Sequence, residues 1–160
     1  MMVLILIVTA IFYFESRKAP LPDTISPEQN NEQNQEENKE GYSLAPELTG
    51  ITSYLNTNEG LQLKDLRGKV VLIDFWTYTC INCIRTLPHL TEWDRKYRDK
   101  GLIIIGVHTP EFEFEKKREN VEMAMEKYGI KYAVVQDNDY ATWHTFRNRY
   151  WPHKYLIDAQ

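Results

Sequence analysis

The chain has 160 residues, which is enough for one domain with short appendages, and its formal net charge is −4. No basic cluster interrupts this acidic balance, so the composition does not indicate a nucleic-acid-binding protein. The two cysteines, Cys80 and Cys83, lie three positions apart. With no other cysteine in the chain, a framework of structural disulfides and a four-cysteine zinc site within one chain are both excluded.

The first fourteen residues, 1–14, carry no charged side chain. The segment is shorter than the ~20 residues of a helix that spans a bilayer. Because no small-residue cleavage pattern follows it, we expect an uncleaved N-terminal membrane anchor rather than a signal peptide or a buried core helix. Arg17 and Lys18 come directly after it, and the positive-inside rule alone would keep the following residues on the cytoplasmic side.

Residues 15–44 are expected to form a disordered linker. Pro20, Pro22 and Pro27 interrupt its first half, and residues 28–40 consist only of Glu, Gln, Asn and Lys. Such a segment has no apolar surface that could offset the loss of chain entropy on folding. We interpret it as a flexible tether to a domain over residues 45–160.

The domain sequence alternates between strand-like and helix-like patterns. Short apolar runs predict strands over residues 61–63, 70–75, 102–107 and 132–135, with a further strand after Pro152. Helical spacing predicts three helices, whose apolar positions are Ile84, Leu87, Leu90, Trp93 and Tyr97, then Phe114, Val121, Met125 and Tyr128, then Tyr140, Trp143, Phe146 and Tyr150. Gly101 and Gly129 follow the first two helices as stop signals, and Asp137 to Asp139 offer caps for the third. This alternation is typical of parallel βαβ units and predicts an α/β fold.

The cysteine pair lies where the strand over 70–75 passes into the helix over 80–100. At a helix N-terminus, unpaired backbone N–H groups and the positive end of the dipole favour a thiolate, so Cys80 is the expected nucleophile. Cys83 lies one turn further on nearly the same face, so the two sulfurs can close a disulfide locally. With no third cysteine, the pair would cycle between its own reduced and oxidised forms.

This stretch resembles the active site of thioredoxin-fold proteins, in particular the membrane-linked branch of TlpA/ResA-like and DipZ-like redoxins. Trp76 matches the aromatic residue before the first cysteine, Asp74 the buried acid near the dithiol, and Pro88 the proline in the active-site helix. Pro152 matches the cis-proline that faces the dithiol. One departure is the dipeptide Ile-Asn between the cysteines, where thioredoxins have Gly-Pro, and it leaves the direction of electron flow open.

The resemblance implies a thioredoxin-like three-layer sandwich with a mixed sheet. It also implies a membrane-tethered, monomeric thiol-disulfide oxidoreductase without a cofactor or metal, in which a Cys80–Cys83 disulfide exchanges with protein disulfides and with a membrane thiol-disulfide electron donor. A reducing role or one in cytochrome c maturation fits this branch, with the domain on the extracytoplasmic side. Cys80 would attack the substrate, Cys83 would resolve the mixed disulfide, and Asp74 would take up a proton, while Trp76, Trp151 and Pro152 would contact the substrate.

Two alternatives remain open. A peroxidase of the alkyl hydroperoxide reductase type would place a threonine three residues before the reactive cysteine, as Thr77 stands here, but it would also want a proline at position 73, which is Ile73. A Cu(I) chaperone would use both thiolates with a histidine such as His153 as a third ligand. His108, at the end of a predicted strand, is a candidate for a supporting role.

The resemblance also predicts where the domain is incomplete. Thioredoxin folds continue beyond the position of Gln160 with one more antiparallel strand and a final helix. Without those elements we expect a C-terminally truncated domain with an unpaired sheet edge and a tendency to aggregate.

Overall fold

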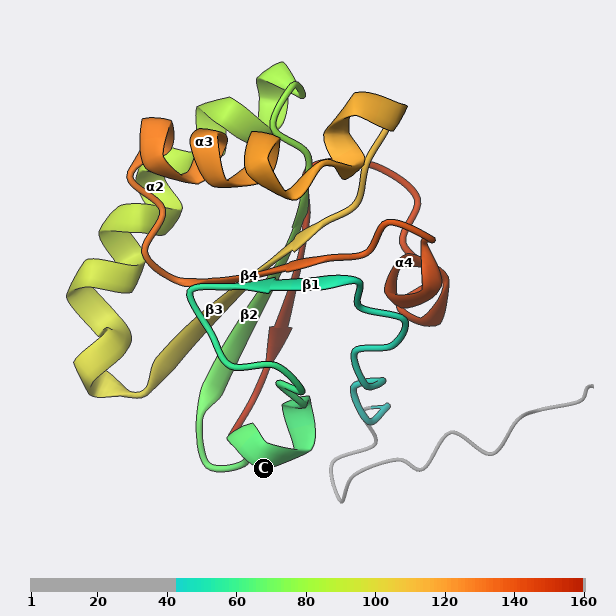
Figure 1. The fold of residues 1–160 in the computed structure, drawn as a ribbon. Coiled ribbons are helices and arrows are strands. Elements are labelled where there is room, and N and C mark those ends of the chain that lie inside the picture. Colours follow the sequence, from blue (N-terminus) through green and yellow to red (C-terminus); the bar gives the residue numbers. More distant parts are fainter. Residues whose placement is uncertain (1–42, 160) are drawn as a thin grey trace, which may run out of the picture. The chain divides into compact units, whose positions relative to one another are not determined.

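The computed structural model describes residues 43–159, and the predicted anchor and most of the predicted linker lie outside this range. Leu44 to the C-terminus forms one compact unit. Its sheet has five strands, β1 (Ser53–Leu55), β2 (Val70–Trp76), β3 (Leu102–His108), β4 (Ala133–Gln136) and β5 (His153–Ile157), in the order β1-β4-β3-β2-β5. β2, β3 and β4 run parallel, while β1 and β5 pair antiparallel with β4 and β2, so the sheet is mixed as expected (Figure 1).

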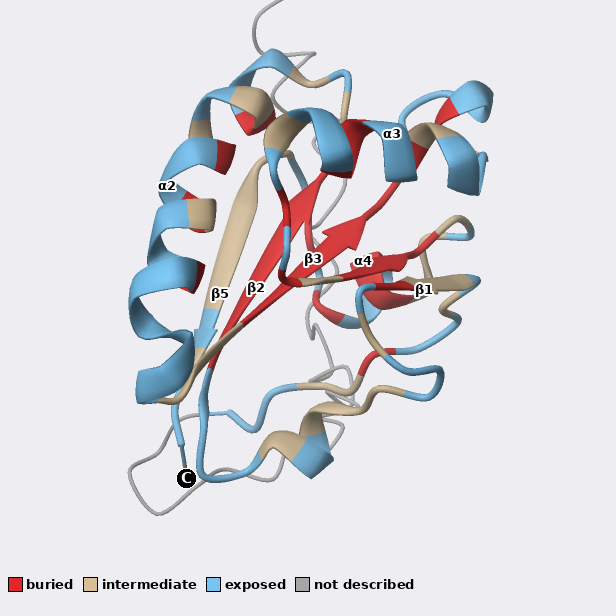
Figure 2. Ribbon diagram, turned by 60° about the vertical axis from the view of Figure 1, so that its left-hand side comes forward, coloured by how far each residue is buried: buried red, intermediate tan, exposed pale blue. Residues whose placement is uncertain are grey.

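Helices cover both faces of this sheet. The helices are α2 (Ile81–Tyr97), α3 (Arg118–Tyr128) and the short α4 (Ala141–Thr145), with 3-10 turns at Leu63–Leu66, Arg98–Lys100 and Glu113–Lys116. Leu87 and Leu90 of α2 and Val121 of α3 pack in one core cluster, whereas Trp143 of α4 belongs to a second cluster on the opposite face. The central strands between these layers are almost entirely buried (Figure 2).

Strand β2 contributes to both clusters because its side chains alternate between the two faces. Leu72 and Trp76 pack with the residues of α2 and α3, while Ile73 and Phe75 pack with those of α4. Asp74 has the same parity as Leu72 and Trp76, so it lies on the face that α2 covers. The strand therefore places an acid beneath the helix that carries the cysteines.

Each of the three predicted helices differs from the structure, either in its length or in the residues on its buried face. Trp93 is 43% exposed, and Asp94 takes the buried position of α2 instead, because its carboxylate pairs with Arg98 one turn later. Phe114 belongs to a separate 3-10 turn rather than to α3. α4 ends at Thr145, so Tyr150 lies beyond it and is exposed.

The prediction of a strand over residues 61–63 is wrong. Gln62 and Leu63 lead into a 3-10 turn whose backbone N–H groups at Leu63 and Lys64 donate to the carboxylate of Glu47. The N-terminal strand forms instead at Ser53–Leu55, where it pairs with β4. The long-range partner Glu47 decides this local structure, and alternation over three residues could not reveal it.

Both predicted glycine stops are confirmed. Gly101 and Gly129 adopt left-handed conformations with φ of 95° and 68°. The peptide bond between Trp151 and Pro152 is cis, as the resemblance implied. β5 lies at one edge of the sheet among the described residues, and Leu156 on it is 71% exposed.

Candidate active site

The two cysteines occupy unequal positions at the start of α2. Cys80 is the N-cap residue and is partly exposed, whereas Cys83 in the first turn is completely buried. Both are free thiols, and the backbone N–H of Cys83 donates to the Sγ of Cys80 at 3.3 Å. This contact satisfies one of the N–H groups that every helix N-terminus leaves unpaired, and it places partial positive charge beside the outer sulfur.

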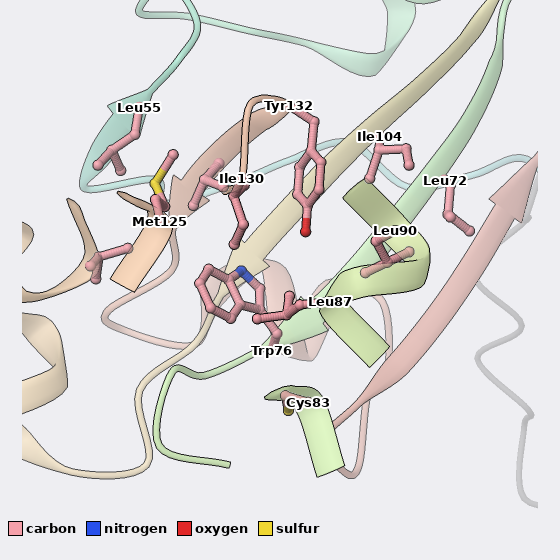
Figure 3. Packing of buried hydrophobic residues seen from close by; sticks show 12 residues of the cluster. Leu55, Leu72, Trp76, Cys83, Leu87, Leu90, Ile104, Met125, Ile130 and Tyr132 are labelled. Atoms are coloured by element: carbon pink, nitrogen blue, oxygen red, sulfur yellow. The ribbon is translucent and has the colours of Figure 1, made fainter. Parts of the chain in front are cut away.

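The inner thiol is embedded in the main core cluster. Figure 3 shows Cys83 at one end of that cluster, with Leu87 and Trp76 beyond it. Burial raises the pKa of the Cys83 thiol, and the contact with Cys80 and the charge of Asp74 act in the same direction. Cys83 therefore stays protonated until a base takes its proton.

Asp74, the acid that the resemblance implied, lies on the same face of β2 and has no exposed surface, and its role as the base stays a prediction. Burial raises the pKa of its carboxyl from 3.8 to about 6, against the lowering effect of Lys154. The Nζ of Lys154 lies 2.9 Å from Oδ1 of Asp74, and the antiparallel register places these two residues opposite each other on β5 and β2. A carboxyl with a pKa near 6 can exchange protons close to neutral pH.

Lys154 was missed by the sequence analysis. Its ammonium also lies 3.4 Å from the Oγ1 of Thr86, whose hydroxyl donates to the carbonyl oxygen of Cys83. The residue thus joins β5, the buried acid and the first turn of α2. Only the pairing register between β2 and β5 could have revealed this contact in advance.

Trp76 has no exposed surface, so the expectation that it contacts a substrate is wrong. Its indole packs under α2 above Gly106, where an added Cβ would come within 2.9 Å of Nε1. Trp151 and Pro152 are partly exposed, and Trp151 packs against the cluster that contains Cys83. Their assignment to substrate contact stays a prediction.

His108 packs against the residues that precede Cys80. Its ring stacks on Tyr78 and meets Trp76 edge-on, and its Nε2 lies 3.3 Å from the Oγ1 of Thr77. Burial lowers its pKa to about 4, so the imidazole is neutral at physiological pH. It acts as a packing and hydrogen-bonding group here rather than as a titrating one.

Glu115 is a further residue that sequence reasoning missed. It is fully buried, and it accepts hydrogen bonds from the Thr79 hydroxyl at 2.5 Å and from the backbone N–H groups of Glu111 and Phe112 at 2.6 Å and 2.9 Å. Burial acts to raise the pKa of its carboxyl, but these bonds and one from Thr77 outweigh burial and hold the pKa below its ordinary value. No periodic pattern marks a buried glutamate on a loop.

His153 does not join the cysteines. It lies opposite Phe75 in the register of β5 and β2, so it faces the α4 layer rather than Cys83. Its ring contacts Asn148, Tyr150 and Tyr155, so it is not placed to serve as the third Cu(I) ligand beside the two thiolates. Within residues 43–159, no three His, Cys, Asp or Glu side chains are grouped so that they could hold a metal ion.

Comparison with known proteins agrees with this geometry. The AhpC/TSA family profile matches residues 44–160. Protein DipZ of Mycobacterium bovis is 57% identical over 122 residues, which cover 75% of this chain but 18% of DipZ. The thiol-disulfide oxidoreductase YkuV of Bacillus subtilis is 31% identical over 113 residues, which cover 71% of this chain and 75% of YkuV. The solution structure of an oxidised thioredoxin-like protein superimposes with a TM-score of 0.66 at 31% identity, over 71% of this chain and 76% of that chain.

Proposed function

Because the chain belongs to the AhpC/TSA family, we propose that its domain is a thiol-disulfide oxidoreductase that reduces or exchanges protein disulfides through Cys80 and Cys83. One observation carries the proposal. The partly exposed sulfur of Cys80 caps the helix, and the buried residue Cys83, one turn away, donates its backbone N–H to that sulfur. An outer sulfur can reach a substrate, and an inner one can reach only the outer sulfur. The kinship to YkuV supports the same chemistry.

The reaction proceeds in two exchanges. The Cys80 thiolate attacks one sulfur of a substrate disulfide, forms a mixed disulfide and releases the other substrate sulfur as a thiolate, which takes up a proton. The Cys83 thiolate then attacks the Sγ of Cys80 and releases the second substrate thiol. Two electrons pass to the substrate, and Cys80 and Cys83 are left as a disulfide, which a donor thiol reduces again.

Asp74 enters at the second exchange. Since burial holds the Cys83 thiol protonated, its attack requires a proton acceptor, and Asp74 lies near enough for its charge to raise the pKa of that thiol. Lys154 keeps part of the Asp74 population ionised near neutral pH. Asp74 therefore serves as the acceptor, directly or through a water molecule.

A peroxidase is the alternative that the family and Thr77 favour. In the structure, however, Thr77 is fully buried and its hydroxyl lies 3.3 Å from the Nε2 of His108, so it is turned into the protein. This arrangement supports disulfide exchange over peroxide reduction. The rate at which the reduced chain consumes peroxide distinguishes a peroxidase from a disulfide-exchange enzyme.

The proposal extends to a membrane-tethered, monomeric enzyme whose domain lies on the extracytoplasmic side. Its support is the uncharged apolar segment 1–14, the polar linker after it and the resemblance to membrane-linked redoxins. Within residues 43–159, no helix has the length and apolar character needed to cross a bilayer. The proposed membrane partner is a thiol-disulfide electron donor.

The test is dithiothreitol-driven reduction of insulin by the wild type and by the Cys80→Ser and Cys83→Ser variants. We expect efficient turnover by the wild type alone. When the pre-reduced Cys83→Ser variant is mixed with insulin in the absence of dithiothreitol, we expect a trapped mixed disulfide, because no inner thiol is present to release Cys80. Equal turnover by all three chains would contradict the proposal. Peroxide consumption that needs Cys80 but not Cys83 would favour the peroxidase instead.

A further inference from the structure

Two phenylalanines stand out at the edge of the sheet where the cysteines lie. Phe112 and Phe114 are 48% and 49% exposed, and their rings stack with centroids 5.5 Å apart and planes 5° apart. Phe114 also lies 6.4 Å from the ring of Tyr78, two residues before Cys80. Contiguous exposed aromatic rings of this kind mark interaction surfaces more often than single exposed apolar residues do.

The backbone beneath these rings is held in place at each end. Glu115 accepts from the N–H groups of Glu111 and Phe112, as described above. The carbonyl oxygen of Phe114 accepts from the Tyr78 hydroxyl at 3.2 Å and from the Nδ2 of Asn120 at 2.8 Å, while the Tyr140 hydroxyl donates to the carbonyl of Pro110. These bonds hold the loop over residues 110–115 at several points, and we call this loop the shelf: the rings of Phe112 and Phe114 are exposed on it, while Glu115 is buried beneath them.

Burial of the Glu115 carboxylate under this loop costs folding free energy. Within residues 43–159 it makes no ion pair, although it is a fully buried carboxylate. A buried charge without a cation is tolerated only when hydrogen bonds satisfy it. Glu115 accepts hydrogen bonds both from Thr79, which precedes Cys80, and from the backbone N–H of Phe112. It therefore connects the segment that carries the exposed rings to the loop before Cys80.

We propose that Tyr78, Phe112 and Phe114 form a docking platform for an extended segment of the substrate polypeptide that carries apolar and basic side chains beside the disulfide. This inference rests on the proposed disulfide exchange and names its substrate class. A platform that is rigid before binding loses little entropy when the segment docks.

Two features of the platform select this occupant. The ring separations of 6.4 Å and 5.5 Å approach the ~6.6 Å between alternate side chains on one face of an extended chain. Glu111 and Glu113, which are exposed and neighbour the two phenylalanines in the sequence, add acidic charge here: Glu113 pairs with Lys116 at 2.6 Å, whereas Glu111 makes no ion pair within residues 43–159. An acidic rim complements a basic neighbour and disfavours an acidic one.

The test compares three disulfide-linked peptides and one small disulfide. One peptide carries Phe two residues from its cysteine and an adjacent Lys; the second has Ser for Phe, and the third has Glu for Lys. Bis(2-hydroxyethyl) disulfide is too small to reach the platform and reports the chemistry alone. The chains are the wild type, the double variant Phe112→Ser/Phe114→Ser, and Met123→Ser, which removes a 61% exposed apolar side chain from α3 as the matched control.

We expect the wild type and Met123→Ser to prefer the Phe-Lys peptide over the Ser peptide about tenfold in kcat/KM, which corresponds to about 1.4 kcal/mol. The double variant should lose this preference and keep the wild-type rate on the small disulfide. Equal rates on the first two peptides in the wild type, or an unchanged preference in the double variant, would overturn the platform. Equal rates on the Lys and Glu peptides would overturn its basic selectivity.

If the wild type reduced none of the four disulfides, the proposed function would fail on its own. Binding of the same peptides, with serine in place of cysteine, to the wild-type chain then decides the platform without catalysis. Fluorescence polarisation should show tighter binding of the Phe-Lys peptide, and this difference should vanish in the double variant. Equal binding of the Phe-Lys and Ser peptides would overturn the inference.

Discussion

Asp74 and Lys154 form a buried acid–base pair beneath the dithiol. The carboxyl has no exposed surface, while the side chain of Lys154 is 27% exposed and lies 2.9 Å away. A buried ion pair contributes little net stability because desolvation offsets the attraction between its charges. This small contribution to stability is consistent with the role in proton transfer at Cys83 that we propose above.

Asparagine at position 74 should stabilise the domain at neutral pH. The pKa of Asp74 rises from 3.8 to about 6 on folding, so its contribution to stability is fully present below pH 3.8 and is lost as the pH rises through about 6. Above that pH the buried charge costs about 2–3 kcal/mol, which Asp74→Asn should recover. Urea unfolding at pH 5 and pH 8 measures this gain, with Asp99→Asn at an exposed site as control. A variant less stable than the wild type at pH 8 would contradict the assignment.

Methionine at position 154 should slow the second exchange near neutral pH. Without the ammonium, which lowers the pKa of Asp74, that pKa rises further above about 6, so less carboxylate is available at pH 7. Resolution of a preformed mixed disulfide, followed by stopped flow from pH 5 to 9, should show its acidic limb displaced upward in Lys154→Met and largely restored in Lys154→Arg. Unchanged pH profiles in both variants would remove Lys154 from this role.

Among the elements, the 3-10 turn at Glu113–Lys116 depends on one buried carboxylate. Glu115→Leu should cost about 3–5 kcal/mol of unfolding free energy because it leaves the N–H groups of Glu111 and Phe112 without an acceptor. Glu115→Gln keeps one acceptor oxygen and should cost about 1–2 kcal/mol. Urea unfolding and amide exchange at these two N–H groups measure both effects.

The pH dependence of that comparison has a definite sign. Because the folded-state pKa of Glu115 lies below its ordinary value of 4.5, the advantage of the wild type over Glu115→Gln is complete above pH 4.5 and disappears as the pH falls through the folded-state value. Equal stability of the two chains at pH 7 would mean that the charge of Glu115 does not hold the turn.

Elements with strong local signals could be predicted from the sequence. β2 and α2 were, because an unbroken apolar run and a helical spacing around Leu87 and Leu90 depend on neighbours in the chain. The strand Ser53–Leu55 was missed, and a strand was wrongly predicted over residues 61–63, because β4 and Glu47, distant in sequence, determine these segments. A pattern of neighbouring residues in the sequence contains no information about partners that are distant along the chain.

The candidate site divides in the same way. Cys80 and Cys83 follow from the motif and its spacing, whereas the buried Asp74 and the cis-proline were implied by the family resemblance. Lys154 becomes visible only once β5 is paired with β2, and Glu115 only once the loop is folded. The sequence motif suggested that Trp76 contacts the substrate, but its side chain has no exposed surface and belongs to the core.

For the whole molecule, the chain spans 18% of DipZ, so the activity and partners of the larger relative remain proposals for this protein. The position of the domain relative to a membrane is the proposal that depends most on residues 1–14. We expect the full chain to sediment with membranes and to be released by detergent but not by carbonate, whereas a chain starting at Ser43 stays in the supernatant. Recovery of the full chain in the supernatant would contradict the anchor.

Labelling of intact cells decides on which side of the membrane the domain lies. If the domain is extracytoplasmic, a membrane-impermeant maleimide added to intact cells should label Cys80 after reduction. Labelling only after the cells are opened would place the domain in the cytoplasm, as Arg17 and Lys18 would by themselves suggest.

The measurement that tests the central claim most directly is a redox titration of the purified chain in glutathione buffers, with alkylation and mass spectrometry of the peptide that contains Cys80 and Cys83. We predict a single two-electron transition in which both thiols disappear together, and complete recovery of both on return to reducing buffer. Thiols that stay free across the titration, or a cross-link that does not reopen, would contradict it.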